Sequence, residues 1–549
     1  MADETFDAII VGAGFAGIYQ LYKLRNLGLK CLVIDQAGDV GGTWYWNLYP
    51  GAMSDTESYV YRFSWDRDDL VNYRWKEHYV KQPEVLAYLN HVADKYELRK
   101  DMRFNTALEF ANWSDSDERW HVTAGGSKIT SRYLVTGLGL LSKTNLPDIP
   151  GIDSFQGDMY HTAKWPKDYD VTGKNVAVIG CGSTGVQVIT EIGQKVGQMT
   201  CYQRHPQYSV PSGDREVTPE DRQYWDDNWD SIWHQVFNSI TAFGFKESDR
   251  SYHDATPEER EQIFQNAWDQ GNGFRFMFAT FNDIATDLEA NEGAQDFIRR
   301  QIDRIVKDPE KAKKLKPYDV YARRPLCDGN ASNGQKYFEQ FNRENVDIVD
   351  LKEASIEQIE AKGIRTSDGV LHEHDLIIFA TGFDAVEGNY TRIAIEGRDG
   401  LSMKEYWDEM GPTSYLGTSL PEFPNFFMIS GPKGPFTNNP PMIEVQVEFI
   451  SQAIEQAEKV DKASRKPIEA TKEAEREYSA LCDQLASTSL FWKAEDNWIF
   501  GANIPGKKRC LRFFFGGLQA YRQKVQEVQE NGYAGFKPFT QSHVASARL

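Results

Sequence analysis

The pattern Gly12-x-Gly14-x-x-Gly17 constrains the fold of this chain most, because an apolar run precedes it and a helical run follows it. The glycines of such a unit permit a tight turn, close approach of the backbone to a pyrophosphate, and close packing of helix on strand. Asp35 ends the next apolar run, where a carboxylate can accept hydrogen bonds from ribose hydroxyls. The N-terminal residues therefore predict a βαβ dinucleotide-binding unit.

A second pattern of the same kind, Gly180-x-Gly182-x-x-Gly185, follows the apolar run NVAVIG and opens a helical run. The next strand-like run ends in Gln203-Arg204 instead of an acid. A carboxylate would repel a 2′-phosphate, whereas Arg204 can pair with it bidentately, so NADPH is favoured over NADH. A surface arginine at a strand end is the alternative. The N-terminal position of the first unit suggests FAD, so the two units together predict a flavin that a nicotinamide nucleotide reduces.

The composition excludes several classes of protein. A chain of 549 residues with 40% hydrophobic residues can form about two to four globular domains. A net charge of −20 argues against a nucleic-acid or anionic-membrane partner. No basic leader and no apolar run of about 18 residues is present, so neither a secretory signal nor a membrane span is expected.

The cysteines give no sign of disulfide bonds or of a metal site. They are scattered, without a C-x-x-C pair, at Cys31, Cys181, Cys201, Cys327, Cys482 and Cys510. In a chain of this size the pattern indicates reduced thiols in a cytoplasmic protein, and no metal is expected.

The predicted fold class is α/β, with two Rossmann-like dinucleotide-binding domains, one for FAD and one for NADP, and a helical insertion in the NADP domain. Large aromatic residues recur every four positions within the insertion and predict one buried helix face, at Trp225, Trp229, Trp233 and Phe237. The expected boundaries are 1–145 for the first part of the FAD domain, 146–214 for a linker and the first part of the NADP domain, 215–325 for the insertion, 326–380 for the second part of the NADP domain, and 381–549 for the second part of the FAD domain with a C-terminal pocket segment.

Disulfide reductases share a layout with two nucleotides, but they carry paired cysteines just after the first βαβ unit. The corresponding segment here, GDVGGTWYWNLYPGAMSD, contains no cysteine, so a dithiol relay is excluded. The main remaining use of an NADPH-reduced flavin is its reaction with O₂ to a C4a-(hydro)peroxyflavin, which oxygenates a substrate.

Three further motifs carry a resemblance to a known family. They are Gly41-Gly42-x-Trp44 with Tyr49-Pro50-Gly51 and Asp55, the dodecamer FQGDMYHTAKWP at 155–166, and ATGFD at 380–384. Together they resemble the type I Baeyer–Villiger monooxygenases. The likeness extends over essentially the whole chain and is closest to the cyclohexanone monooxygenase branch, through FRFMFATFNDIAT, YARRPLCD, GPKGPFTNNPP and WIFGANIPGKKR. In this resemblance, the dodecamer distinguishes the family from the N-oxygenating flavin monooxygenases.

The resemblance implies two catalytic residues. Arg324 matches the arginine that stabilises the anionic peroxyflavin, and a permanent cation there keeps the peroxide deprotonated for attack on a carbonyl. The same cation can stabilise the negatively charged adduct. Asp55 matches the acid that orients this arginine. A structural Arg–Asp pair at a domain seam is the alternative.

The resemblance also implies cofactor and substrate contacts. Arg323 is expected to join Arg204 at the 2′-phosphate, while Thr184 and Gln187 contact NADP and Trp44 belongs to the flavin site. Trp498 matches a tryptophan near the nicotinamide ribose, with a core tryptophan as the alternative. Asn439 stands where an apolar residue is expected, which makes the pocket more polar. The substrate pocket is expected to be formed by Leu140, Leu141, Phe436, Thr437, Asn439 and Phe500.

The dodecamer is expected to couple the two domains through Phe155, Gly157, His161 and Trp165. No step of the chemistry demands a general base at His161, and the stretch lies where the chain passes from the FAD domain to the NADP domain. A static structural role and a direct chemical role are the alternatives.

The function implied is NADPH- and O₂-dependent Baeyer–Villiger oxidation of a small-molecule ketone, with cyclic ketones giving lactones and sulfoxidation as a side activity. A flavin N- or S-oxygenase is one alternative. A non-oxygenating NADPH oxidase or redox-sensing flavoprotein is another. The protein is expected to be a monomer.

Overall fold

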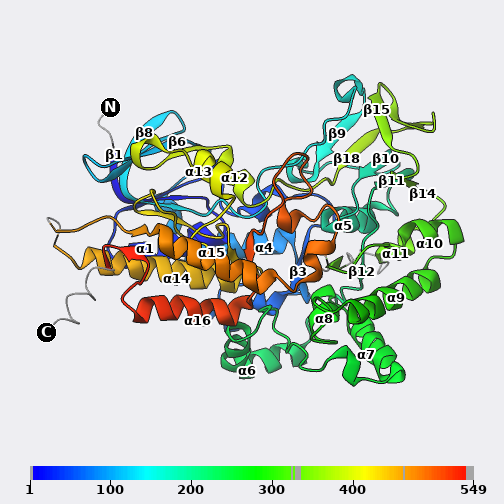
Figure 1. Ribbon diagram of the computed structural model, residues 1–549. Helices are drawn as coiled ribbons and strands as arrows, with labels where there is room; N and C mark the ends of the chain where they lie inside the picture. The colour runs from blue at the N-terminus through cyan, green and yellow to red at the C-terminus, as the bar shows by residue number, and fades with distance from the viewer. Residues whose placement is uncertain (1–3, 323–325, 328–335, 462–463, 540–549) are drawn as a thin grey trace.

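The computed structural model describes residues 4–322, 326–327, 336–461 and 464–539. It is an α/β structure in which two sheets lie side by side above a group of helices (Figure 1). Within the described ranges, the larger sheet has eight strands. Their order is β19 (Ala394–Glu396), β6 (Leu108–Ser114), β7 (Arg119–Ala124), β8 (Ser127–Thr136), β1 (Glu4–Val11), β2 (Cys31–Ile34) and β5 (Met102–Arg103), with β20 (Phe426–Met428) beside β8.

The first sheet combines a parallel nucleotide-binding half with an antiparallel meander. β1 pairs in parallel with both β2 and β8, whereas β6, β7 and β8 run antiparallel to their neighbours in the meander. Helix α1 (Phe15–Asn26) connects β1 to β2, and α14 (Asn439–Glu458) packs against α1. The two segments that build this unit are therefore far apart in the sequence.

The second sheet is parallel throughout the described part of the chain. Its order is β14 (Val346–Asp350), β11 (Gln198–Gln203), β10 (Asn175–Ile179), β18 (Leu376–Phe379) and β9 (Asp158–His161). Helix α5 (Ser183–Ile192) connects β10 to β11. The order is Rossmann-like, so the predicted fold class is confirmed.

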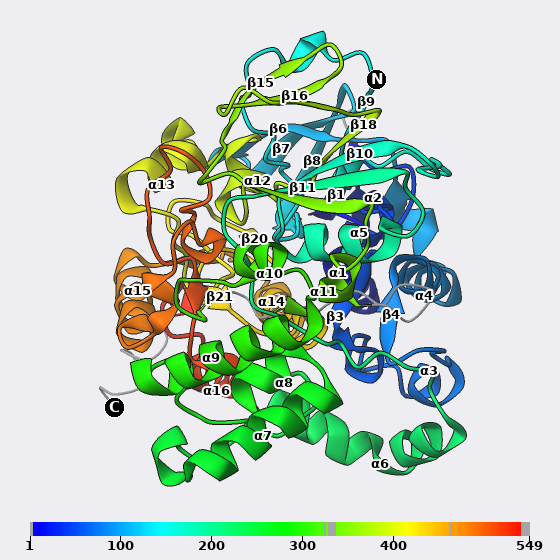
Figure 2. The same cartoon turned by 90° about the vertical axis from the view of Figure 1, so that its right-hand side faces the viewer.

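Helices follow β11 before the chain returns to the second sheet, and Figure 2 shows them below the sheets. Two of them begin at a threonine followed by proline, where the hydroxyl of Thr218 or Thr256 accepts the N–H of the acid three residues on. Trp225, Trp229 and Trp233 are buried as predicted. These helices are α6 (Pro219–Phe237), α7 (Pro257–Gln270), α8 (Gly273–Phe278), α9 (Leu288–Ile305) and α10 (Pro309–Leu315).

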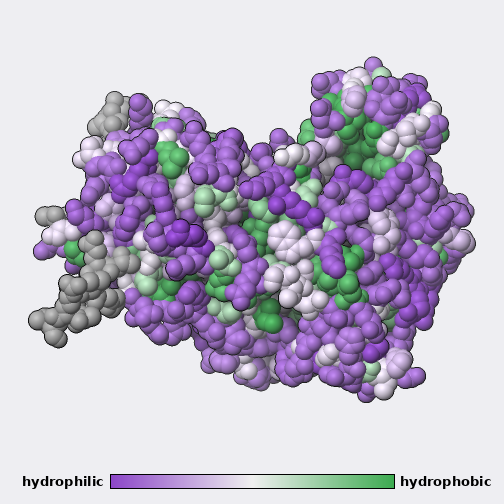
Figure 3. Space-filling model, viewed as in Figure 1, coloured by the Kyte–Doolittle hydropathy of each residue, from purple (hydrophilic) through white to green (hydrophobic). Residues whose placement is uncertain are grey.

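The surface is notched between the two sheets, and apolar residues are visible on the wall of the notch (Figure 3). Among the residues described, the helices include none whose length and hydropathy suit a membrane span. The domain boundaries given above stay predictions.

Candidate functional site

The first glycine turn can be built only from glycine at two positions. Gly12 has φ +106°, and a Cβ there would lie 2.4 Å from the carbonyl oxygen of Gly137. A Cβ on Gly17 would lie 1.7 Å from the carbonyl oxygen of Gly12. Gly14 is the N-cap of α1 and offers no side-chain cap, so the first N–H groups of the helix remain available to an anion.

The second glycine turn repeats this geometry in the other sheet. Gly180 has φ +105°, and a Cβ there would lie 2.5 Å from the carbonyl oxygen of Ala380. A Cβ on Gly185 would lie 2.2 Å from the carbonyl oxygen of Gly180. Gly182 is the N-cap of α5, again without a side-chain cap. Each sheet therefore presents a helix N-terminus suited to a pyrophosphate.

A cavity of about 590 Å³ extends from the first turn. Gly12, Gly14, Asp35 and Trp44 line it. The Asp35 carboxylate accepts the backbone N–H of Ala13 at 2.6 Å and that of Ala37 at 2.7 Å. Burial raises the Asp35 pKa, and these two hydrogen bonds oppose the rise. An uncapped helix end beside a buried acid fits a dinucleotide such as FAD.

A second cavity of about 350 Å³ lies beside the first. It is lined by eight residues predicted for the substrate or for NADP, namely Leu140, Leu141, Thr184, Gln187, Phe436, Thr437, Asn439 and Trp498. Trp44 and Asp55 also line it. Trp44, Leu140, Leu141 and Asn439 also line the first cavity, so the two cavities share a wall.

Phe500 lies outside the lining of this cavity. It is fully buried, and its ring stacks on Trp492 with centroids 4.0 Å apart. The sequence does not predict much of the aromatic wall, although the segment FRFMFATFNDIAT carries part of the family resemblance. The aromatic residues missed are Tyr61, Phe243, Phe274, Phe278, Phe491, Phe513 and Phe515.

Asp55 lies on β3 (Met53–Glu57) and is buried. The side-chain amide of Gln187, on α5, donates to Asp55 Oδ1 at 3.3 Å and to the carbonyl oxygen of Met53 at 3.1 Å. The hydroxyl of Tyr49 donates to the Gln187 Oε1 atom at 2.8 Å. Asp55 therefore lies at the contact between the two nucleotide-binding units.

Of the three arginines predicted for the 2′-phosphate and for catalysis, the structure describes only Arg204. Arg323 and Arg324 lie outside the described residues. Arg204 follows β11 and forms an ion pair with Asp496 at 3.0 Å between Nη2 and Oδ2. His205 also contacts Asp496, through Nε2 at 3.0 Å.

Strand β9 takes up four residues of the dodecamer, Asp158–His161, and the protonation state of His161 follows from its contacts. Nδ1 accepts the N–H of Ala163 at 3.1 Å, so Nε2 carries the proton and donates to the carbonyl oxygen of Gly382 at 3.1 Å. Burial lowers the His161 pKa, which favours this neutral form. His161 therefore ties the edge of the second sheet to the ATGFD turn.

The other residues of the dodecamer predicted to couple the domains pack locally. A Cβ on Gly157 would lie 2.6 Å from the carbonyl oxygen of Asp375 and from the Phe155 ring. Trp165 is buried, with its ring 6.0 Å from that of Tyr160. The domain-coupling role of these residues stays a prediction.

The sequence also does not predict a buried network of ion pairs next to the cavities. The Arg512 guanidinium donates to both carboxylate oxygens of Glu387, on α12 (Glu387–Thr391), through Nε at 2.8 Å. Lys507 pairs with Glu387 at 2.9 Å and contacts Asp384 of the ATGFD turn. No local sequence pattern signals these pairs, because their members lie more than a hundred positions apart.

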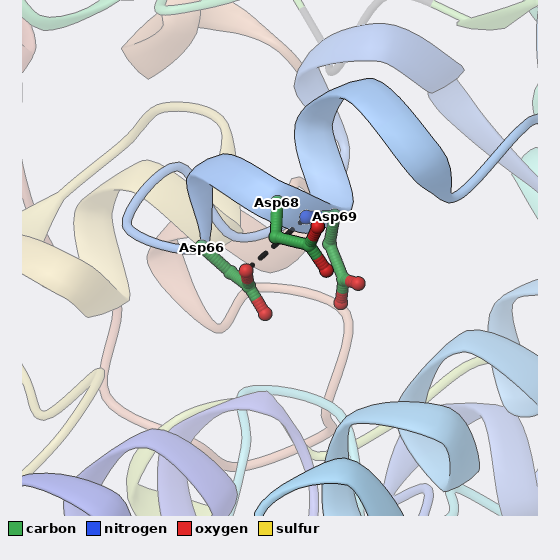
Figure 4. Close-up of side chains that lie close together, drawn as sticks. All are labelled: Asp66, Asp68 and Asp69. Carbon is green, nitrogen blue, oxygen red and sulfur yellow. Dashed lines mark hydrogen bonds between the residues drawn. The ribbon is translucent and has the colours of Figure 1, made fainter.

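An acidic cluster at the start of α3 (Arg67–Asn72) has the composition of a cation site (Figure 4). Lys95 Nζ lies 2.8 Å from Asp66, 2.9 Å from Asp68 and 2.9 Å from Asp69. A cation of the chain itself thus already contacts all three carboxylates, and no metal site is assigned to the cluster.

Comparisons with known proteins agree with this geometry. Residues 9–278 match the family model described as pyridine nucleotide-disulphide oxidoreductase. The chain is 50% identical over 533 residues to a Baeyer–Villiger monooxygenase of Pseudooceanicola batsensis, covering 96% of this chain and 95% of that protein.

This chain belongs to the Baeyer–Villiger monooxygenase family. It is 48% identical to cyclohexanone 1,2-monooxygenase of Acinetobacter sp., over 97% of this chain and 96% of the relative. It is also 47% identical to phenazine N-monooxygenase PhzNO1 of Lysobacter antibioticus, over 97% of each. The predicted resemblance is confirmed, and this last relative is named for N-oxygenation.

Solved structures of the Baeyer–Villiger family superpose on nearly the whole chain. A closed cyclohexanone monooxygenase structure gives a TM-score of 0.94 at 50% identity, covering 98% of this chain and 99% of that one. The enzyme of Rhodococcus sp. Phi1 bound to NADP⁺ gives 0.94 at 49% identity, with the same coverage. An open structure gives 0.90 at 48% identity, over 97% and 99%.

Proposed function

We propose that this family member binds FAD and NADPH and catalyses Baeyer–Villiger oxidation of cyclic ketones, such as cyclohexanone, to lactones. The overall reaction consumes one ketone, one O₂, one NADPH and one proton, and yields lactone, NADP⁺ and water. The observation that carries the proposal is the aromatic second cavity. It shares Trp44, Leu140, Leu141 and Asn439 with the cavity of the first glycine turn. A ketone in it would lie against the flavin-facing wall.

The chain's own residues would bind, orient and shield the reactants. FAD, when bound and reduced, supplies the chemistry that activates O₂. The rings of Phe436 and Trp498 make an apolar wall that excludes bulk water, which strengthens electrostatic interactions inside. Asp55 is a buried carboxyl group that lines the second cavity, and the proposal assigns it the orientation of the predicted cation Arg324. That cation would stabilise negative charge on the substrate oxygen.

Product analysis tests the proposal directly. Cyclohexanone, NADPH and ¹⁸O₂ are expected to give ε-caprolactone with one heavy oxygen atom. Arg324→Ala is expected to abolish lactone formation while NADPH still reduces the flavin. Unchanged lactone formation in this variant would remove Arg324 from the mechanism. Absence of lactone from every ketone of a panel would overturn the proposed function.

N-oxygenation of an aromatic heterocycle is the second candidate, because the Lysobacter relative is as similar to this chain as the cyclohexanone-oxidising one. The second cavity is lined by many aromatic rings, which suits a flat heterocycle as well as a ketone. Assays with phenazine and cyclohexanone under the same conditions separate the two reactions. An N-oxide without lactone would favour this candidate.

We also propose that the protein is a cytoplasmic monomer, as the scattered cysteines and the net charge of −20 suggest. Sedimentation of the FAD-bound protein measures its mass in solution. A stable dimer would contradict the monomer.

A further inference from the structure

The side-chain amide of Gln187 forms three hydrogen bonds that join the two nucleotide-binding units. Both amide hydrogens are donated to the flavin unit, to the Met53 carbonyl at 3.1 Å and to Asp55 Oδ1 at 3.3 Å. The amide oxygen accepts from the Tyr49 hydroxyl at 2.8 Å. A flipped amide would place its oxygen against the Met53 carbonyl and the Asp55 carboxylate, so the chemistry fixes this orientation.

The backbone of Gly51 also packs closely against the backbone of α5 at Gln187. Gly51 has φ +82°, and a Cβ there would lie 2.6 Å from the carbonyl oxygen of Gln187 and 3.0 Å from Glu191 Cβ. Segment 49–55 therefore lies directly against α5, the helix whose N-terminus faces the second cavity at Thr184. Gln187 itself is only 3% exposed, so water cannot easily replace its contacts.

We propose that Gln187 is a positioning residue that holds the Asp55 carboxylate in its working orientation and does so only while α5 is seated against segment 49–55. The inference rests on the proposed function, since it assigns Asp55 a part in the oxygenation. It gives the motif Tyr49-Pro50-Gly51 a role: Tyr49 fixes the amide, and Gly51 admits the helix. The nucleotide helix and the acid are thereby linked through one side chain.

The consequence is a specific kinetic signature. A buried carboxylate that loses one donor keeps its charge but loses its fixed direction, and a hydrogen bond to a charged group is worth roughly tenfold or more in an equilibrium. Gln187→Leu is therefore expected to lower the lactone formed per NADPH consumed by roughly tenfold. A role limited to nucleotide binding would instead raise the KM for NADPH and leave this ratio unchanged.

The experiment uses the FAD-bound full chain and compares Gln187→Leu, Tyr49→Phe and Asp55→Asn. Tyr49→Phe removes only the hydroxyl and is expected to give a smaller loss in the same direction. Gln198→Leu, at an exposed position of β11, is the matched control and is expected to match the wild type. Thermal melts and flavin content check the fold of each variant.

The double variant Gln187→Leu/Asp55→Asn decides whether Gln187 acts through Asp55. If it does, the double variant forms lactone no more slowly than Asp55→Asn alone, because no carboxylate is left for Gln187 to orient. Multiplied losses would overturn the inference, as would unchanged product yield in both Gln187→Leu and Tyr49→Phe. A wild-type protein that forms no lactone would instead show that the proposed function is wrong.

Discussion

Glu444, on α14, is a fully buried carboxyl group beside the flavin unit. The backbone N–H of Ser64 donates to its Oε1 atom at 2.6 Å, and the Ser64 hydroxyl contacts Oε2. Burial raises the Glu444 pKa to about 8, and the neighbouring Glu448 adds to the rise. The carboxyl group is therefore mostly protonated in the folded protein at neutral pH, whereas it is ionised in the unfolded chain.

This raised pKa predicts how stability depends on pH. A group whose folded pKa lies above its unfolded value contributes fully below the unfolded value, near 4.5, and its contribution is lost as pH rises through about 8. Glu444→Gln removes the need to ionise a buried group. It is expected to raise the Tm by about 2 °C or more at pH 9 and to have little effect at pH 5.

Thermal melts at pH 5, 7 and 9 with one fixed scan rate measure this effect. Glu455→Gln is the matched control, because Glu455 lies on the same helix and pairs with Lys459 at 3.1 Å at the surface. A gain of equal size at all three pH values would show that the carboxyl group is not the cause.

At the scale of the element, Gly182 and Gly185 of the second glycine turn have different roles. Gly185 packs against the backbone of the turn, where an added Cβ would lie 2.2 Å from the carbonyl oxygen of Gly180. A Cβ on Gly182 would have no neighbour within 4 Å, and its φ of −70° suits alanine. Gly182 is therefore free of packing constraints and available for the approach of a pyrophosphate.

Alanine at each of these positions separates packing from ligand binding. Gly185→Ala is expected to destabilise the protein by about 1–3 kcal/mol, because the overpacked turn must shift. Gly182→Ala is expected to keep the Tm within about 2 °C, since only a helix cap changes. Its added methyl group is expected to raise the KM for NADPH by roughly tenfold by opposing the pyrophosphate. Melts and NADPH titrations measure both; equal losses of stability would contradict the distinction.

The elements around both glycine turns could be predicted because their signals are local. An apolar run, a glycine turn and a helical run follow one another within about 30 residues in each case. Strand β9 lacked such a signal: it is short, and its partner β18 lies about 220 positions later, as the bond from His161 to Gly382 shows. No strand is therefore predicted for the dodecamer from its sequence.

The candidate site was predictable only where a motif or a family resemblance named its residues. Asp55 and Gln187 were both singled out, yet nothing in the sequence indicated that they touch, because they are 132 positions apart. Phe500 was placed in the pocket by resemblance, whereas the chain turns its ring onto Trp492. Contacts of this kind depend on how distant elements pack, which no local pattern encodes.

On the scale of the whole molecule, one C-terminal segment joins the second cavity to the second sheet and to the ATGFD turn that follows β18. Trp498 lines the second cavity, and Arg512 binds Glu387 next to the ATGFD turn. Asp496 lies between α15 (Lys472–Ala486) and Trp498 in the same segment, and it forms an ion pair with Arg204 at the end of β11. Movement of this segment would therefore change the cavity wall and the predicted phosphate site together.

The contact between Arg204 and Asp496 predicts competition with the nucleotide. The two side chains are 58% and 37% exposed, so their ion pair is worth about 0–1 kcal/mol and can be exchanged easily. A 2′-phosphate carries more charge than a carboxylate and would compete for the same guanidinium. Asp496→Asn removes the competing anion and its repulsion, so the KM for NADPH is expected to fall by roughly threefold to tenfold.

NADH provides the internal control for this prediction, because it lacks the 2′-phosphate and its KM is expected to stay unchanged in Asp496→Asn. Glu477→Gln, at an exposed position of α15, makes the same change in net charge away from the site. Steady-state kinetics with both nucleotides at two salt concentrations separate a local effect from the general field, since salt screens exposed charges. A higher KM for NADPH in Asp496→Asn would mean that Asp496 orients Arg204 for the phosphate instead of competing with it.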